Sequence, residues 1–133
     1  MEPMSEDWER AVAIVAHPDD LEYGAASAVA RWTSQGKTVS YVLATSGEAG
    51  IAGLAPERTK PLREQEQRRS AAVVGVDHVE FLSHADGEVE YGLPLRRDLA
   101  RWLAKARQAG LDEESIEALF RETFRSTATQ EVA

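Results

Sequence analysis

The chain has 133 residues, of which 43% are hydrophobic, enough for one compact domain with its own core. Fifteen lysines and arginines stand against 23 aspartates and glutamates, so the formal net charge is -8. A negatively charged protein would repel the phosphates of a nucleic acid, so we expect no nucleic acid partner. The absence of cysteine excludes disulfides and thiolate ligands, which leaves His, Asp and Glu to hold any metal.

Neither end of the sequence has a pattern that predicts a helix or a strand. Residues 1–10 are polar and acidic and lack the basic and apolar regions of a secretory signal, so we interpret them as an N-terminal lead-in. Residues 126–133 are small and polar, which is typical of a flexible tail. No apolar run approaches the ~18 residues of a membrane span. We therefore expect a cytoplasmic protein without a membrane span.

Between these ends the sequence alternates between strand and helix patterns. An apolar run that ends in a turn predicts a strand at residues 12–16, and a segment rich in β-branched and aromatic residues predicts one at 38–45. A third, short strand is predicted at residues 78–82. Apolar residues at helical spacing predict three helices, at residues 21–35, 62–74 and 93–109. The segment 46–61 carries several glycines and prolines and is predicted to be a loop.

Strands that alternate with helices predict right-handed βαβ units. The fold class is therefore α/β, a three-layer, Rossmann-like parallel sheet with flanking helices over residues 11–110. After Gly110 no further strand follows, and apolar residues on one face predict a helix at 111–125. This helix either covers the edge of the sheet or forms a dimer contact, so a homo-oligomer stays open.

The segment Ala-His-Pro-Asp-Asp at residues 16–20 follows the first strand, at the edge where open α/β sheets bind ligands. Pro18 restricts the turn, so that His17 and Asp20 can point to one place. Catalytic zinc is held by three such ligands, and Asp19 beside them is free to take a proton from water. These residue types match metal-assisted hydrolysis. The alternative is a plain polar turn in which Asp20 caps the following helix.

Nucleotide binding is a weaker interpretation of the same turn. The turn lacks the G-x-G-x-x-G pattern that lets a backbone approach a pyrophosphate. The carboxylates of Asp19 and Asp20 would also repel such a group.

The sequence AHPDDLEYG at residues 16–24 resembles the opening motif of the LmbE/PIG-L family of zinc-dependent N-acetylglucosaminide deacetylases. Three further segments follow in the order of that family: ATSGEAG at 44–50, REQE at 63–66, and FL at 81–82 followed by DGE at 86–88. The resemblance extends from residue 11 to residue 107. Four signatures in the same order make a chance match an unsatisfactory explanation.

The resemblance implies a hydrolase that removes the N-acetyl group from an N-acetylglucosamine-type conjugate, with Zn²⁺ as cofactor and a small acetamidosugar as substrate. By position, His17 and Asp20 would be zinc ligands, and Asp19 would be the base that activates water. Glu48 and Arg63 lie in segments that approach the active site in similar proteins, so both are candidates for substrate contact. Alternatively, Glu48 is a solvated loop charge and Arg63 a surface residue of a helix N-terminus.

The resemblance ends before the site of that family is complete. The third zinc ligand of the family is a downstream histidine that follows a further strand, and this chain has no histidine beyond His84. His84, just past the third strand, is the local candidate for that ligand, whereas His78 is expected on the surface. Asp86 and Glu88 are expected to shape a turn around Gly87. The second candidate function is therefore a non-catalytic, truncated or recombined domain that acts by association.

Overall fold

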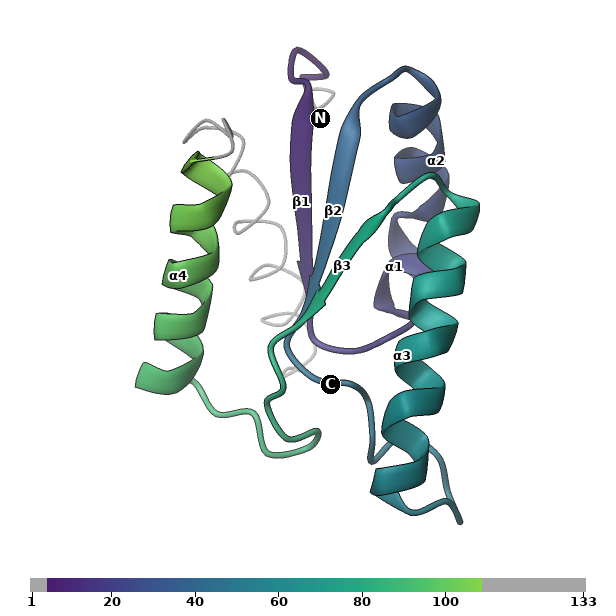
Figure 1. Ribbon diagram of the computed structural model, residues 1–133, viewed down its shortest axis with the longest axis vertical. Coiled ribbons are helices and arrows are strands. Elements are labelled where there is room, and N and C mark those ends of the chain that lie inside the picture. The colour runs from purple at the N-terminus through teal and green to yellow at the C-terminus, as the bar shows by residue number, and fades with distance from the viewer. Residues whose placement is uncertain (1–4, 109–133) are drawn as a thin grey trace, which may run out of the picture.

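Three parallel strands form one sheet in the computed structural model, which describes residues 5–108 (Figure 1). The strands lie in the order β1 (Arg10–Val15), β2 (Thr38–Leu43), β3 (His78–Phe81). Val15 pairs with Leu43, and Leu43 pairs with Phe81. All three strands therefore end at the same edge, which brings the loops that follow them together.

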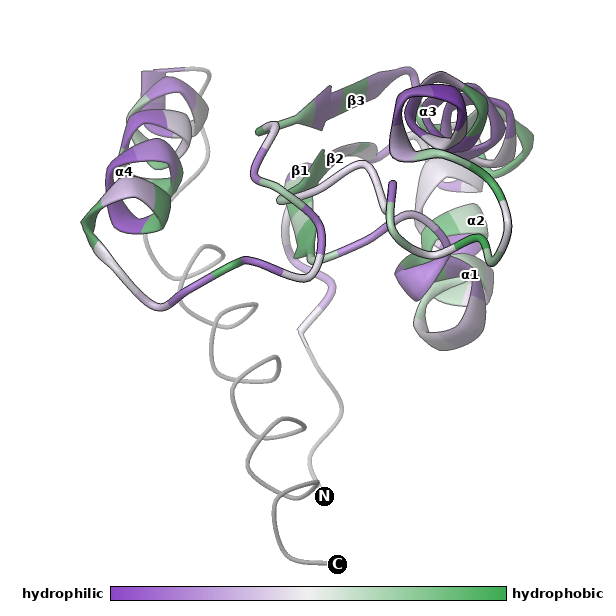
Figure 2. Cartoon of the chain, turned by 90° about the horizontal axis from the view of Figure 1, so that it is seen from below, coloured by the Kyte–Doolittle hydropathy of each residue, from purple (hydrophilic) through white to green (hydrophobic). Residues whose placement is uncertain are grey.

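Helices cover both faces of this sheet. The chain passes from β1 to β2 through α1 (Asp20–Gly24) and α2 (Ala26–Ser34), and from β2 to β3 through α3 (Pro56–Val73). Figure 2 shows these helices on one side of the sheet and α4 (Leu93–Gln108) on the other. This arrangement confirms the predicted three-layer α/β fold. Within residues 5–108, no helix has the length and apolar character to cross a membrane.

The core is divided between the two faces because successive strand residues point to opposite sides. The larger core, on the side of α2 and α3, includes Val29, Val39, Tyr41, Leu43, Ala71 and Val79. On the other side Val12 and Val42 contact Trp102 of α4, which is 6% exposed. The indole Nε1 of Trp102 also donates a hydrogen bond of 3.0 Å to Glu80. One buried tryptophan therefore anchors α4 to the sheet.

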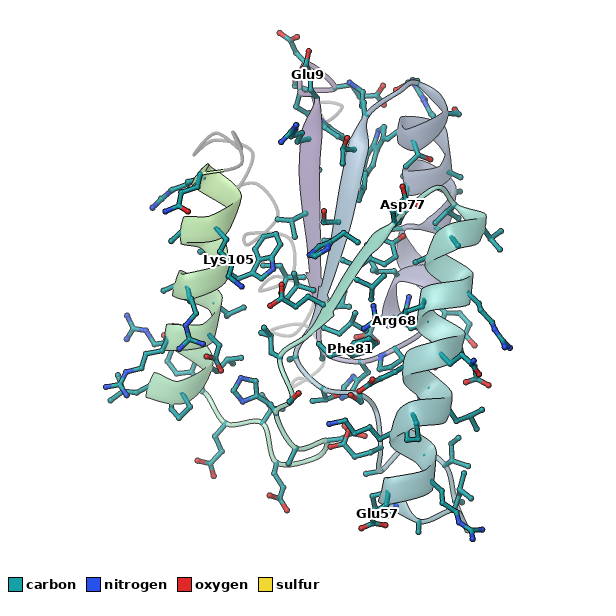
Figure 3. All side chains as sticks on the ribbon, viewed as in Figure 1. Glu9, Glu57, Arg68, Asp77, Phe81 and Lys105 are labelled. Atoms are coloured by element: carbon teal, nitrogen blue, oxygen red, sulfur yellow. The ribbon has the colours of Figure 1, made fainter. Side chains whose placement is uncertain are left out.

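Charged side chains brace the third strand from both faces. Lys105 of α4 points toward the sheet, and its Nζ lies 3.7 Å from the Oε1 of Glu80 (Figure 3). On the other face the guanidinium of Arg68 lies over the ring of Phe81, 5.2 Å from its centre (Figure 3). Arg68 also donates a 2.7 Å hydrogen bond to the carbonyl of Val79. The position of β3 is thus fixed by contacts to α3 and α4.

The segment before β1 packs against the end of α2. The rings of Trp8 and Trp32 meet edge to face, with 5.1 Å between their centres. The ammonium of Lys37 donates hydrogen bonds to the carbonyls of Glu6 and Trp8. The indole of Trp32 donates to the Glu6 carboxylate, and this bond, with the Arg31 charge nearby, lowers the pKa of Glu6. These contacts set the entry of the chain into the sheet.

Two helices differ from their predicted bounds. The helix predicted at 21–35 is divided into α1 and α2 at Ala25, whose φ of -133° leaves the helical region. Helix α3 begins at Pro56 rather than at 62, so the prolines predicted to be loop residues lie inside a helix. Pro56 is tolerated because the first helical position needs no N–H donor. The helix predicted at 111–125 lies outside the described residues.

Candidate active site

The turn that follows β1, residues 16–20 (the first turn), is attached to the loop after β2 by hydrogen bonds at Ala16. The backbone N–H and the hydroxyl of Thr45 both donate to the carbonyl of Ala16, at 3.0 Å each. Two residues later Pro18 is buried, and Asp19 adopts a left-handed backbone conformation with φ 78°. This conformation costs about 1–2 kcal/mol for a residue with a side chain, although Asp and Asn tolerate it best. The surrounding contacts must therefore hold the turn in place.

The turn brings the two predicted zinc ligands together. The Nδ1 of His17 lies 3.6 Å from the Oδ2 of Asp20, and the same oxygen accepts the backbone N–H of His17 at 2.9 Å. Two ligands of a tetrahedral zinc, at bond lengths of ~2.0–2.2 Å, lie about 3.4 Å apart. The pair therefore fits the metal. The alternative in which Asp20 caps the helix is wrong, because Asp19 occupies the N-cap position and makes no side-chain capping bond.

The other nitrogen of His17 faces a carboxylate that the sequence did not predict. The Nε2 of His17 lies 3.2 Å from the Oδ1 of Asp86, whose side chain is only 9% exposed. A carboxylate on the far nitrogen orients a metal-binding histidine and leaves its near nitrogen for the metal. Asp86 does lie in a turn with Gly87, as predicted, but it also belongs to this site.

Glu48 forms hydrogen bonds to both the loop after β2 and the loop after β3, which carries Asp86. Its Oε1 accepts the backbone N–H of Asp86 at 3.0 Å, and its Oε2 accepts that of Ser46 at 3.2 Å. In return, the Oδ2 of Asp86 accepts the backbone N–H of Ala49 at 3.0 Å. Glu48 is thus bonded to backbone on both oxygens, which separates it from a freely solvated loop charge. Its contact with substrate remains a prediction.

Arg63 of α3 reaches the first turn. Its NH2 group donates to the Oδ2 of Asp19 at 2.7 Å and to the carbonyl of Pro18 at 3.0 Å. The side chain of Arg63 is 14% exposed, so the alternative of a surface residue is wrong. Two glycines make room for the guanidinium: a Cβ on Gly50 would lie 2.4 Å from NH1, and one on Gly47 3.0 Å from Nε. The loop after β2 is therefore shaped around Arg63.

An open pocket of about 360 Å³ lies beside this turn, between the first turn and α3. Its lining includes Pro18, Asp19, Glu22, Arg63, Gln67 and Ser70. This volume falls within the range that takes small ligands. A groove of about 430 Å³ lies elsewhere, between the ends of α2 and α3, but its Lys37 is already bonded to backbone carbonyls. Of the two, only the 360 Å³ pocket is lined by residues of the candidate site, Asp19 and Arg63.

The remaining histidines lie apart from the His17–Asp20 pair. The Nε2 of His84 is 3.2 Å from the Oδ2 of Asp98, although without the geometry of a hydrogen bond. His78 is exposed at the start of β3, as predicted. Across residues 5–108, no three His, Asp or Glu side chains are grouped so that they could hold a metal. His84 therefore does not complete the set of ligands in this structure.

The family model of the GlcNAc-PI de-N-acetylases, PIG-L, matches residues 12–127. The chain belongs to the PIG-L/LmbE family. The diacetylchitobiose deacetylase of Thermococcus kodakarensis is 31% identical over 103 residues, which cover 76% of this chain and 39% of that protein. This membership confirms the resemblance found in the motifs at residues 16–24, 44–50, 63–66 and 81–88, and the match extends past residue 107, where the resemblance was predicted to end.

Two solved structures share this fold over the part that aligns. The N,N'-diacetylchitobiose deacetylase of Pyrococcus horikoshii aligns with a TM-score of 0.72 at 29% identity, over 75% of this chain and 38% of that one. A conserved protein of Thermus thermophilus aligns with a TM-score of 0.61 at 32% identity, over 72% of this chain and 42% of that one. The chain therefore spans about two fifths of the length of these relatives.

Proposed function

We propose that this chain is a zinc-dependent hydrolase that removes the N-acetyl group from an N-acetylglucosamine-type conjugate. The observation that carries the proposal is the 3.6 Å spacing between His17 Nδ1 and Asp20 Oδ2, with the Asp86 carboxylate on the other nitrogen of the ring. Membership of the PIG-L family and two relatives named as diacetylchitobiose deacetylases support the choice of substrate.

Each residue of the turn has a distinct task in this proposal. His17 and Asp20 would hold the zinc, and Asp86 would keep the His17 ring in place. When bound, zinc supplies Lewis-acid polarisation of the acetamide carbonyl and a more acidic water. Asp19 accepts a proton from the attacking water and returns it to the amine as the C–N bond breaks, which releases acetate. Arg63 and Glu48 are proposed to line the path of the sugar.

Zinc titration and acetate release test this proposal together. The purified chain should bind zinc and release acetate from N,N'-diacetylchitobiose. Asp19→Asn should keep zinc affinity but lower the rate by about 10²–10⁴-fold, because it removes only the proton acceptor. His17→Ala should lose both zinc and activity, whereas His78→Ala, a change of an exposed histidine at the opposite end of β3, should lose neither. Failure of the parent chain to bind zinc at high micromolar concentration would refute the proposal.

A second candidate function is a non-catalytic domain that acts by association. The observation in its favour is that no third metal donor joins His17 and Asp20 within the described part of the chain. His84→Ala decides whether this histidine supplies that donor in solution, since zinc affinity would then fall. Acetate release that disappears in Asp19→Asn would rule out the non-catalytic candidate.

A further inference from the structure

Helix α3 presents a row of polar side chains to the first turn. Arg63, Gln67 and Ser70 are spaced by four and three residues, so they lie on one face of the helix. Arg63 bonds the Asp19 carboxylate, as described above. Gln67 lies in the middle of the row and is 2% exposed, which is unusual for a helical glutamine. A polar side chain buried to this degree must be satisfied by specific partners.

Gln67 connects the backbone of Asp19 to the partly buried carboxylate of Glu22. Its Oε1 accepts the backbone N–H of Asp19 at 2.9 Å, and its Nε2 donates to the Oε1 of Glu22 at 3.2 Å. The hydroxyl of Ser70 donates to the same oxygen of Glu22. Because a carboxylate accepts only, it fixes which end of the Gln67 amide points to it. The carbonyl end is then directed to Asp19.

The hydrogen bond from the Asp19 N–H to Gln67 holds the only residue of the first turn whose backbone is strained. Asp19 is left-handed, with φ 78°, and its side chain is 56% exposed, so its own packing does little to hold it. Arg63 holds the carboxylate of Asp19, and Gln67 holds the N–H of the same residue. Without the bond to Gln67, the backbone could relax to a conformation that costs less, and the carboxylate would move with it.

We propose that Gln67 is a positioning residue: its amide, oriented by Glu22 and Ser70, holds the backbone N–H of Asp19 and so fixes the Asp19 carboxylate beside the His17–Asp20 pair. This inference rests on the proposed function, in which Asp19 is the base. It assigns a catalytic consequence to a buried residue of α3 that need not touch the substrate or the metal.

The test compares Gln67→Met with Gln67→Glu combined with Glu22→Gln. Methionine keeps the length of the side chain but cannot accept the Asp19 N–H effectively. In the exchanged pair, the carboxylate at 67 still accepts that N–H, and the amide at 22 donates to the carboxylate. Gln65→Met is the matched control, because Gln65 is an exposed glutamine on the same helix. Hydrogen exchange of the Asp19 amide, zinc affinity, KM and kcat are measured for each full-length variant.

In Gln67→Met we expect at least about tenfold faster exchange of the Asp19 amide, since its hydrogen bond is lost. We expect kcat to fall about 10–100-fold, whereas KM and zinc affinity stay within about threefold of the parent. The exchanged pair should recover both the slow exchange and most of kcat. Gln65→Met should behave as the parent in every measurement.

Several results would overturn the inference. One is a folded Gln67→Met variant with parental exchange and kcat, and another is a loss of zinc affinity or KM as large as the loss in kcat. If Gln67→Met does not fold, the exchanged pair decides alone, and a folded pair with fast Asp19 exchange or low kcat contradicts the inference. If the parent chain releases no acetate, the proposed function fails, while the exchange of the Asp19 amide still decides the role of Gln67.

Discussion

Replacing Gly50 with alanine should displace the Arg63 guanidinium from Asp19 and leave the fold intact. The new Cβ would lie 2.4 Å from the NH1 atom of Arg63, about 1 Å short of van der Waals separation. NH1 is at the end of a flexible side chain, so the guanidinium makes the large movement, whereas the Gly47 carbonyl oxygen, 3.2 Å from the new Cβ, needs to shift by only a few tenths of an ångström. The φ of Gly50 is not positive, and alanine therefore adds no backbone strain there.

The expected effects on stability and on activity differ in size. A displacement of about 1 Å removes the 2.7 Å bond from Arg63 to Asp19 and the 3.0 Å bond to the Pro18 carbonyl. The Asp19 side chain is 56% exposed, so the ion pair contributes only about 0.5–1 kcal/mol to the free energy of unfolding. The kcat for acetate release should fall more, about 10–100-fold, because a catalytic group is then misplaced.

Urea unfolding and acetate release at saturating zinc measure the two effects. Gly24→Ala is the control, since a Cβ on Gly24 meets nothing within 4 Å. In an Arg63→Ala background, Gly50→Ala should have little further effect on kcat, because the clash with the guanidinium is gone and only the 3.2 Å contact with the Gly47 carbonyl oxygen is left. The reasoning is refuted if Gly50→Ala lowers kcat equally in both backgrounds, or if it costs several kcal/mol of stability.

Three further changes test other contacts. Asp86→Asn should weaken zinc binding about 10–100-fold in a chelator competition, because it orients His17 less firmly; unchanged affinity would contradict this. Trp102→Ala should lower the free energy of unfolding by about 3–5 kcal/mol in urea, and a loss well under 1 kcal/mol would contradict the docking of α4. Burial, with the Glu22 charge, raises the pKa of Tyr41 from 10.0 to about 12. Its contribution to stability is therefore complete below pH 10 and lost as the pH rises to about 12, and Tyr41→Phe should remove this part of the alkaline destabilisation.

The alternation of strands and helices was predictable because the buried faces of strands and helices impose a characteristic spacing of apolar residues on the sequence. Apolar residues on strands that are covered on both faces form runs such as 11–15, and these runs locate β1 and β2 correctly. The ends of the helices were less predictable. Nothing in the apolar spacing of 21–35 records that Ala25 leaves the helical region. The start of α3 at Pro56 was missed because proline indicates a loop everywhere except in the first turn of a helix.

The site was predictable only where its contacts are local. His17 and Asp20 share one turn, so their spacing of three residues was sufficient to predict that their side chains lie together. The contact of Asp86 with His17 joins loops that are distant in the chain, and it exists because β1 and β3 end at the same edge of the sheet. Gln67 is one of many polar residues of α3, and sequence alone does not distinguish a buried amide from a solvated one.

The same geometry indicates where a third metal ligand would have to approach. The Asp86 turn contacts the Nε2 of His17, and Arg63 contacts the carboxylate of Asp19. Within residues 5–108, β1 is paired with a strand on one side only. In an open α/β sheet whose order reverses after its first strand, the next strand pairs along that free side, and its carboxyl end reaches the same edge. A segment paired there would end at the same edge as the turn that carries His17 and Asp20, whereas Asp86 follows β3 and Arg63 belongs to α3. If the proposed zinc site draws its third donor from such a segment, zinc should bind more tightly when a segment occupies the free side of β1 than when that side is empty.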